Sequence, residues 1–329
     1  MFDPGPEIPI PTSEPPRLMV VVDTEEEFDW SRPLARDNVA VTNIAAQARA
    51  HAVFDRYGLR PVYVIDYPAA TDPAAVGPLR ALVEADRCVI GAHLHPWVNP
   101  PHDEVVSAAN SYAGNLPRAL EAEKLARLTE AIEAGLGVRP TVYRAGRFGV
   151  GPNTAAILAE LGYQIDLSVV PGTDFGRDGG PDFRRLGGRP YRFGPDGRLL
   201  EIPLSVGYVG LLAGLGPRLH RPLSARWAQR AHLPGILSRT RLLERIRLSP
   251  EGITLAEHKR LTAALLARGH RVFGLTYHSP SLAPGLGPYV RSEADLTRFL
   301  ELIDAYCAHF FGALGGLPAT PDDIAALAR

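Results

Sequence analysis

Two histidines and two carboxylates occur at spacings that suit a divalent metal ion. His93 and His95 are two residues apart after an apolar segment, and Asp23 and Glu25 have the same spacing after another. In extended chain, residues two apart point to the same side about 6.5–7 Å from each other, so both imidazoles can face one ion. Two imidazoles and one carboxylate leave a coordination position open, as in catalytic zinc sites. The alternative is an ordinary polar strand end.

Two further segments supply a guanidinium and another imidazole. Arg144 lies in YRAGR and His278 in YHS, each at the end of an apolar run. Taken singly, Asp23 could be a solvated acid or helix cap, Arg144 a surface ion pair and His278 a packed core histidine. However, the carboxyl ends of parallel strands face one common opening, and four such segments fall at predicted strand ends. We therefore expect a charge-assisted hydrogen bond of about 2.7–2.9 Å between Asp23 and Arg144.

Strands that alternate with helices predict the parallel sheet that positions these residues. Short β-branched apolar runs predict buried strands, and amphipathic segments between them predict helices. The expected strands are 17–23, 61–66, 88–93, 140–145, 163–169 and 271–276, and the expected helices are 43–57, 74–85, 117–134, 153–161, 254–268, 293–311 and one from 321. This alternation is typical of βαβ units in one sheet.

Three parts of the chain depart from this alternation. Residues 1–16 contain six prolines and are expected to form an extended tail, with residues 17–329 as a single domain. The segments 190–193 and 199–203 are typical of an inserted hairpin. Residues 208–250, with scattered Gly, Pro and Arg, are expected to form short helices over one face.

Composition excludes several classes of protein. The 329 residues are 46% hydrophobic and 22% charged, which is typical of a globular chain with a sizeable core. The net charge of −1 gives no overall attraction to nucleic acid or to an anionic membrane. No run of about 18 apolar residues is present, and the acidic, Pro-rich N-terminus is unlike a secretory signal, which predicts a cytoplasmic location. Cys88 and Cys307 are expected to be buried and unpaired.

Together, these motifs resemble the polysaccharide deacetylase superfamily, whose shared unit is the NodB homology domain. The resemblance rests on an aspartate after the first strand, GAH with a following histidine, YRAGRFG and LTYHS, in that order. The runs VVDTEEEFDW, GAHLHPW, YRAGRFGVGPNT and HSPSLAPG resemble its WalW-like branch. Covering about residues 17–315, the resemblance implies a distorted parallel (β/α) barrel that removes acetyl groups from a carbohydrate with the help of a metal. The implied partner is a small-molecule or oligosaccharide substrate.

The resemblance also implies three catalytic residues. Asp23 matches the base that takes a proton from water, Arg144 matches the arginine that orients this base, and His278 matches the general acid. An unperturbed imidazole pKa near 6.5 permits both proton states at neutral pH. The acid that pairs with His278 is open at this stage, with Asp166 and Asp174 as candidates.

The implied metal ligands depart from the usual pattern of the family. His93 matches the first metal-binding histidine. The family usually has two adjacent aspartates and a second histidine four places after the first, and this chain has Thr24 and Trp97 at those positions. The implied carboxylate ligand is then Glu25 or the catalytic aspartate itself, His95 is the second imidazole, and zinc is the favoured divalent ion.

Aromatic residues near these loops are candidates for contact with sugar rings. We expect Trp97, Phe148 and Tyr277 to bind substrate, and the alternative for each is core packing. Two other functions remain open from the sequence. One is hydrolysis of a non-sugar C–N bond on the same scaffold, and the other is a non-catalytic sugar-binding protein that has lost its metal.

Overall fold

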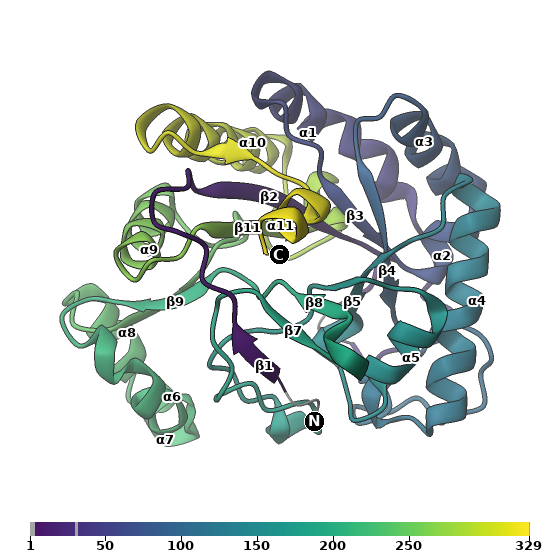
Figure 1. Cartoon of the computed structure of the whole chain (residues 1–329), viewed down its shortest axis with the longest axis horizontal. Helices are drawn as coiled ribbons and strands as arrows, with labels where there is room; N and C mark the ends of the chain where they lie inside the picture. The colour runs from purple at the N-terminus through teal and green to yellow at the C-terminus, as the bar shows by residue number, and fades with distance from the viewer. Residues whose placement is uncertain (1–3, 30–31, 329) are drawn as a thin grey trace.

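A curved, mostly parallel sheet forms the centre of the computed structural model, which describes residues 4–29 and 32–328. Its strands follow the order β1-β7-β8-β6-β5-β4-β3-β2-β11, and β12 also pairs with β2 (Figure 1). All neighbours from β8 to β11 in this order are parallel, whereas β7 is antiparallel to both β1 and β8. The strands are β1 (Pro4–Glu7), β2 (Arg17–Thr24), β3 (Val62–Ile65), β4 (Val89–Leu94), β5 (Val142–Ala145), β6 (Ile165–Asp166), β7 (Tyr191–Phe193), β8 (Leu199–Glu201), β11 (Val272–His278) and β12 (Leu317–Pro318).

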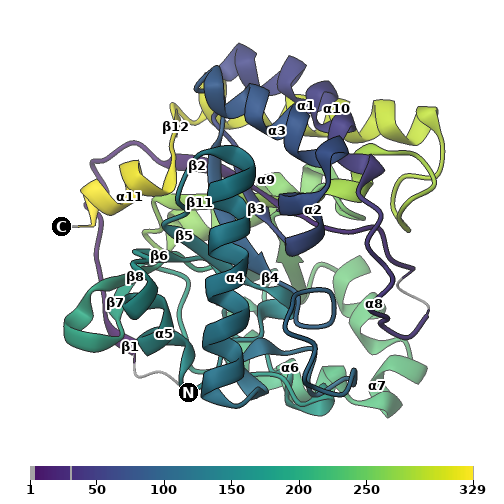
Figure 2. The ribbon, with the colours of Figure 1, turned by 90° about the vertical axis from the view of Figure 1, so that its right-hand side faces the viewer.

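Helices cover the outer face of this sheet (Figures 1 and 2). Helix α4 starts after Pro117 and ends at Gly137, whose φ of 74° favours glycine. Helix α9 starts with a capping box formed by Thr254 and Glu257. The helices on this face are α1 (Gln47–Phe54), α2 (Tyr67–Thr71), α3 (Pro73–Glu84), α4 (Arg118–Leu136), α5 (Thr154–Leu161), α9 (Leu255–Ala267) and α10 (Glu293–Cys307). Helix α11 (Pro321–Leu327) instead lies across one end of the barrel (Figure 1). The expected (β/α) barrel architecture is confirmed.

The barrel is distorted because β8 and β11 do not pair with each other. Single backbone hydrogen bonds cross the gap between them. The Leu248 amide donates to the Ser205 carbonyl at 2.9 Å, and the Thr276 amide donates to the Leu248 carbonyl at 3.1 Å. The segments that follow β8 and precede α9 therefore complete the wall at the carboxyl end.

Alternation along β2 explains how the sheet points a carboxylate inward. Val20 and Val22 are fully buried in the main core, which lies between the sheet and the helices. Met19 and Val21 belong to a second core, which has members on β3, β5, β6 and β8. Because side chains two residues apart share a face, Asp23 continues the Met19–Val21 face into the barrel mouth.

The inserted hairpin is confirmed as β7 and β8, and the segment 208–250 contains the expected short helices, α6 (Gly216–Ser224), α7 (Arg226–Arg230) and α8 (Leu233–Arg239). Two antiparallel strands that the sequence analysis did not predict enclose these helices, β9 (Val206–Val209) and β10 (Glu244–Arg247).

The described part of the proline-rich segment is extended, and its strand β1 pairs with β7. The boundary between tail and domain stays a prediction. Cys88 and Cys307 are buried and unpaired, as expected. Within the described ranges, none of the helices has both the length and the apolar composition that a membrane crossing requires.

Candidate active site

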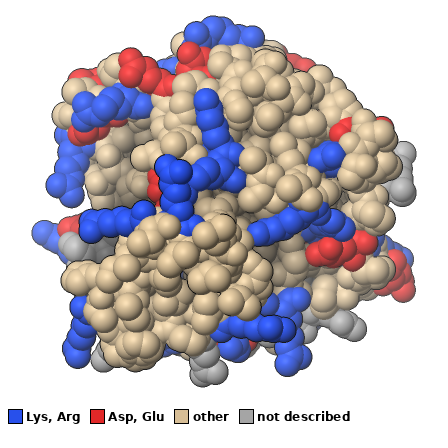
Figure 3. Space-filling view, turned by 90° about the vertical axis from the view of Figure 1, so that its left-hand side faces the viewer, with Lys and Arg blue, Asp and Glu red and all other residues tan. Residues whose placement is uncertain are grey.

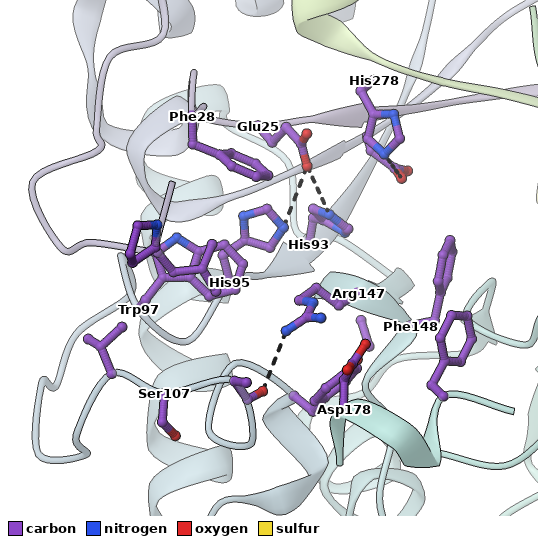
Figure 4. Close-up of a pocket in the computed structure, with 18 of the residues that line it drawn as sticks. Glu25, Phe28, His93, His95, Trp97, Ser107, Arg147, Phe148, Asp178 and His278 are labelled. Carbon is purple, nitrogen blue, oxygen red and sulfur yellow. Dashed lines mark hydrogen bonds and ion pairs between the residues drawn. The ribbon is translucent and has the colours of Figure 1, made fainter. Parts of the chain in front are cut away.

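A cavity of about 650 Å³ lies at the carboxyl ends of the parallel strands (Figure 4). Its wall includes Asp23 and Glu25 from the end of β2, His93 and His95 from the end of β4, and His278, the last residue of β11. These strands are neighbours or near neighbours in the sheet, so residues distant in sequence meet in one place. The structure thus brings together five of the residues that the sequence analysis selected.

Glu25, His93 and His95 form a compact group of potential ligands (Figure 4). Glu25 Oε2 lies 3.6 Å from His93 Nε2 and 3.5 Å from His95 Nε2. The opposite ring nitrogens are engaged, because His93 Nδ1 donates to the Arg144 carbonyl at 2.9 Å and His95 Nδ1 to Glu26 Oε2 at 2.7 Å. Both Nε2 lone pairs therefore face the Glu25 carboxylate.

This donor set fits a divalent cation. Burial, and to a smaller extent the neighbouring His95, lowers the pKa of His93 to about 3. Burial lowers the pKa of His95 to about 4. Both rings are therefore neutral at pH 7. Burial and nearby carboxylates raise the pKa of Glu25 well above its usual value, and its Oε1 is buried without a hydrogen-bond partner. A divalent cation between these groups would bring Glu25 to its ionised form and give its oxygen and both Nε2 atoms a partner, and neutral imidazole with carboxylate is a usual zinc donor set.

Residues outside this group hold His95 in place. Glu26 accepts from His95 through Oε2 and from Trp97 Nε1 through Oε1 at 2.8 Å, while its own amide donates to Asp66 Oδ2 at 2.7 Å. A Cβ on Gly146 would lie 2.4 Å from the His95 ring, so only glycine permits this packing. A carboxylate behind a histidine fixes its tautomer and raises its basicity as a ligand. Glu26 and Asp66 were not predicted from the sequence, although the three consecutive glutamates after β2 were a visible signal for Glu26.

The three aromatic candidates have different places in the structure. Trp97 and Phe148 line the cavity. Trp97 is 2% exposed and stacks on the His95 ring at 4.3 Å, so most of its surface supports this histidine. The expectation for Tyr277 is wrong, because its fully buried ring packs on Phe299 and its hydroxyl donates to Gln47 Oε1 at 3.2 Å. Alternation along β11 points Tyr277 toward the helices.

Asp23 and Arg144 form the expected charge-assisted contact below the cavity. Arg144 Nη1 donates to Asp23 Oδ1 at 2.6 Å and to Thr276 Oγ1 at 2.8 Å, and its Nε donates to the Leu167 carbonyl at 3.1 Å. Burial alone would raise the pKa of Asp23, but opposing charges, chiefly that of Arg144, outweigh this effect and lower the pKa to about 2. Asp23 is therefore ionised, with Arg144 held in one orientation.

His278 faces Asp23 on one side and Glu251 on the other. Its Nε2 lies 3.7 Å from Asp23 Oδ2, and its Nδ1 contacts Glu251 Oε2 at 2.9 Å. Burial lowers the pKa of His278, but the Glu251 carboxylate outweighs it and the net pKa is raised. Asp166 and Asp174 were the wrong candidates for this partner. Asp166 instead accepts from Ser168 Oγ at 2.5 Å, and Asp174 lies 3.5 Å from Arg184.

No protein-family model matches this chain, and no curated protein matches it. Solved structures share its fold. One is a protein from Mycobacterium smegmatis that is provisionally assigned as a polysaccharide deacetylase, with a TM-score of 0.52 and 19% identity over 97% of this chain and 98% of that one. Another is 4-alpha-glucanotransferase from Thermococcus litoralis, with a TM-score of 0.52 and 12% identity over 95% of this chain and 40% of that one. At such identities the likeness establishes the fold alone, and this fold is the one expected for polysaccharide deacetylases.

Proposed function

We propose that this chain is a metal-dependent hydrolase of the polysaccharide deacetylase superfamily that removes acetyl groups from a carbohydrate. The observation that carries the proposal is the convergence in one cavity of a Glu25–His93–His95 ligand group with an ionised Asp23 and with His278. The fold shared with the Mycobacterium smegmatis protein supports it. Membership of the WalW-like branch stays a prediction from the sequence motifs.

The residues of the cavity have separate roles in the proposed hydrolysis. Held by Glu25, His93 and His95, a divalent ion such as zinc would lower the pKa of water and polarise an acetyl carbonyl. Asp23 Oδ1 is engaged by Arg144, so its Oδ2 is the oxygen that accepts a proton from the attacking water.

His278 is placed to deliver a proton to the leaving amine or alcohol. Glu251 takes the hydrogen on Nδ1, so Nε2 is the nitrogen that faces Asp23 and the cavity. The backbone amide of His278 also donates to Glu251 Oε1 at 3.0 Å, and Ser281 Oγ donates to the same oxygen at 2.6 Å. These contacts fix the carboxylate and, through it, the orientation of the imidazole.

The proposal is tested by metal content and acetate release. Protein treated with chelator should bind one zinc ion per chain and unfold at a higher temperature, because a ligand at a hundred times its Kd stabilises the native state by about 2.7 kcal/mol. Zinc-loaded protein should release acetate from N-acetylated or O-acetylated oligosaccharides. His93→Ala and Glu25→Gln should lose both effects, and the exposed His102→Ala should keep them.

Two results would contradict this function. Wild-type protein that binds no divalent ion would favour the non-catalytic alternative. Protein that binds metal and hydrolyses a non-sugar amide, but releases acetate from none of the sugars, would favour hydrolysis of a non-sugar C–N bond.

Replacing Glu251 with glutamine should shift the alkaline limb of the pH profile of kcat/KM. His278 acts as an acid only when protonated, so activity falls as the pH rises through its pKa. Glu251 raises this pKa against the effects of burial and of Arg247, so its neutral analogue should move the limb to lower pH. The exposed Glu301→Gln is the matched control, and an unmoved limb in Glu251→Gln would remove Glu251 from this role.

A further inference from the structure

Charge is distributed unevenly along this chain although its net charge is only −1. Residues 202–243 contain six arginines and neither aspartate nor glutamate. The corresponding part of the structure is the basic excursion, defined here as residues 210–243, which leaves β9, forms α6, α7 and α8, and returns to β10. The net charge of the whole sequence therefore does not reveal this local excess of positive charge.

Four arginines of the basic excursion are directed to solvent. The helices α6, α7 and α8 occupy one corner of the molecule, away from α1 and α3 (Figures 1 and 2). Within the described part of the chain, no carboxylate lies within 4.0 Å of the guanidinium groups of four arginines that the structure shows as exposed. They are Arg218, Arg230, Arg239 and Arg241. These charges are therefore available to an external anion.

The same excursion exposes large apolar side chains. Leu211 is 85% exposed, Trp227 62% and Ile236 50%, and Leu215 is exposed as well. These four make up half of the eight large hydrophobic residues that are exposed among the described residues. In the lower part of Figure 3, which views this side of the molecule, Lys and Arg side chains border a broad area of uncharged surface.

We propose that the basic excursion docks on the surface of an anionic lipid bilayer. Trp, Leu and Ile side chains gain free energy on entering the boundary between headgroups and acyl chains, where an indole is especially well accommodated. Arginines beside them bury their alkyl stems and keep the guanidinium at the level of the phosphates. Nucleic acid would use the charge but not the exposed aliphatic side chains, so the combination favours lipid.

Vesicle co-sedimentation of the full-length protein tests this proposal. The protein should pellet with vesicles of equal parts phosphatidylcholine and phosphatidylglycerol, remain in solution with phosphatidylcholine alone, and be released by about 0.5 M salt. Each surface arginine contributes about fivefold to partitioning, so Arg230→Gln combined with Arg239→Gln should weaken binding about 25-fold. Trp227→Ser should also weaken binding to the anionic vesicles, although it leaves the charge of the protein unchanged.

Matched controls separate docking from general charge and from unfolding. Arg118→Gln combined with Arg127→Gln removes the same charge from exposed positions of α4, and Leu317→Ser removes an exposed apolar side chain elsewhere. Both should bind like wild type, and all variants should keep the wild-type melting temperature because the altered residues are exposed. Absence of binding to the anionic vesicles, or equal losses in the controls, would overturn the proposal. The proposal would also be overturned if the protein bound DNA tightly and Trp227→Ser did not weaken this binding. The ligand of the basic excursion would then be a polyanion and not a bilayer.

Discussion

His278→Ala should lower kcat for a natural acetylated sugar by about 10²–10⁴ while the protein keeps its metal. The imidazole lies beside Asp23, and Glu251 holds its Nδ1, so Nε2 is the group positioned to protonate the leaving atom. Without this proton an amine must leave as a strongly basic anion. Steady-state kinetics and metal analysis of the purified variant provide the two measurements.

The leaving group supplies an internal control for this role. An activated aryl acetate needs little protonation, so its turnover should suffer less from His278→Ala than turnover of an amide. His102→Ala, an exposed histidine outside the cavity, should leave both substrates unaffected. Loss of metal from His278→Ala would instead identify His278 as a ligand and make the ligand role of His95 doubtful. Unchanged turnover of every substrate would exclude the acid role.

Asp23→Asn should lower kcat by a similar factor of about 10²–10⁴, because an amide cannot accept the proton of the attacking water. The substitution preserves shape, and Asn can still accept a hydrogen bond from Arg144. It also leaves the buried guanidinium without the carboxylate that it contacts at 2.6 Å, and breaking a buried ion pair costs about 3–5 kcal/mol. We therefore expect an inactive protein with a measurably lower free energy of unfolding.

A second substitution distinguishes catalysis from stability. Asp23→Asn combined with Arg144→Met removes both charges and should recover part of the lost stability in denaturant unfolding, without recovering activity. Asp196→Asn, at an exposed turn, is the control for an acid-to-amide change. If Asp23→Asn loses its metal and Glu25→Gln retains it, then Asp23 is the carboxylate ligand. Full activity in Asp23→Asn would place the base elsewhere.

Much of the architecture could be predicted because parallel strands have a strong sequence signal. Continuous β-branched runs such as that of β2 are typical of strands that are buried on both faces. Functional side chains in such folds gather at the carboxyl ends of these strands, so Asp23, His93 and His278 could be located before the structure was known. The contact between Asp23 and Arg144 followed from the same reasoning.

The remaining parts of the site depend on tertiary contacts that a linear pattern does not contain. Glu251 lies between β10 and α9, outside the predicted strands, and it reaches His278 only because this segment completes the barrel wall. Tyr277 was placed in the site from its position beside His278, but alternation along a strand sends adjacent side chains to opposite faces. Strand β9 is short and includes a glycine, which weakens the periodic signal by which strands are found.

The antiparallel pairing of β9 with β10 has a consequence for how this chain can vary. Val209 and Glu244 are direct partners in that pair, so the excursion leaves and re-enters the barrel at a single point. A segment whose two ends are adjacent can be lengthened, shortened or replaced by a tight turn with little effect on the strands that hold it. Glu251 and His278 lie on the barrel side of this junction. The basic excursion can therefore be exchanged, by evolution or by design, while Glu251 and His278 keep their positions in the cavity.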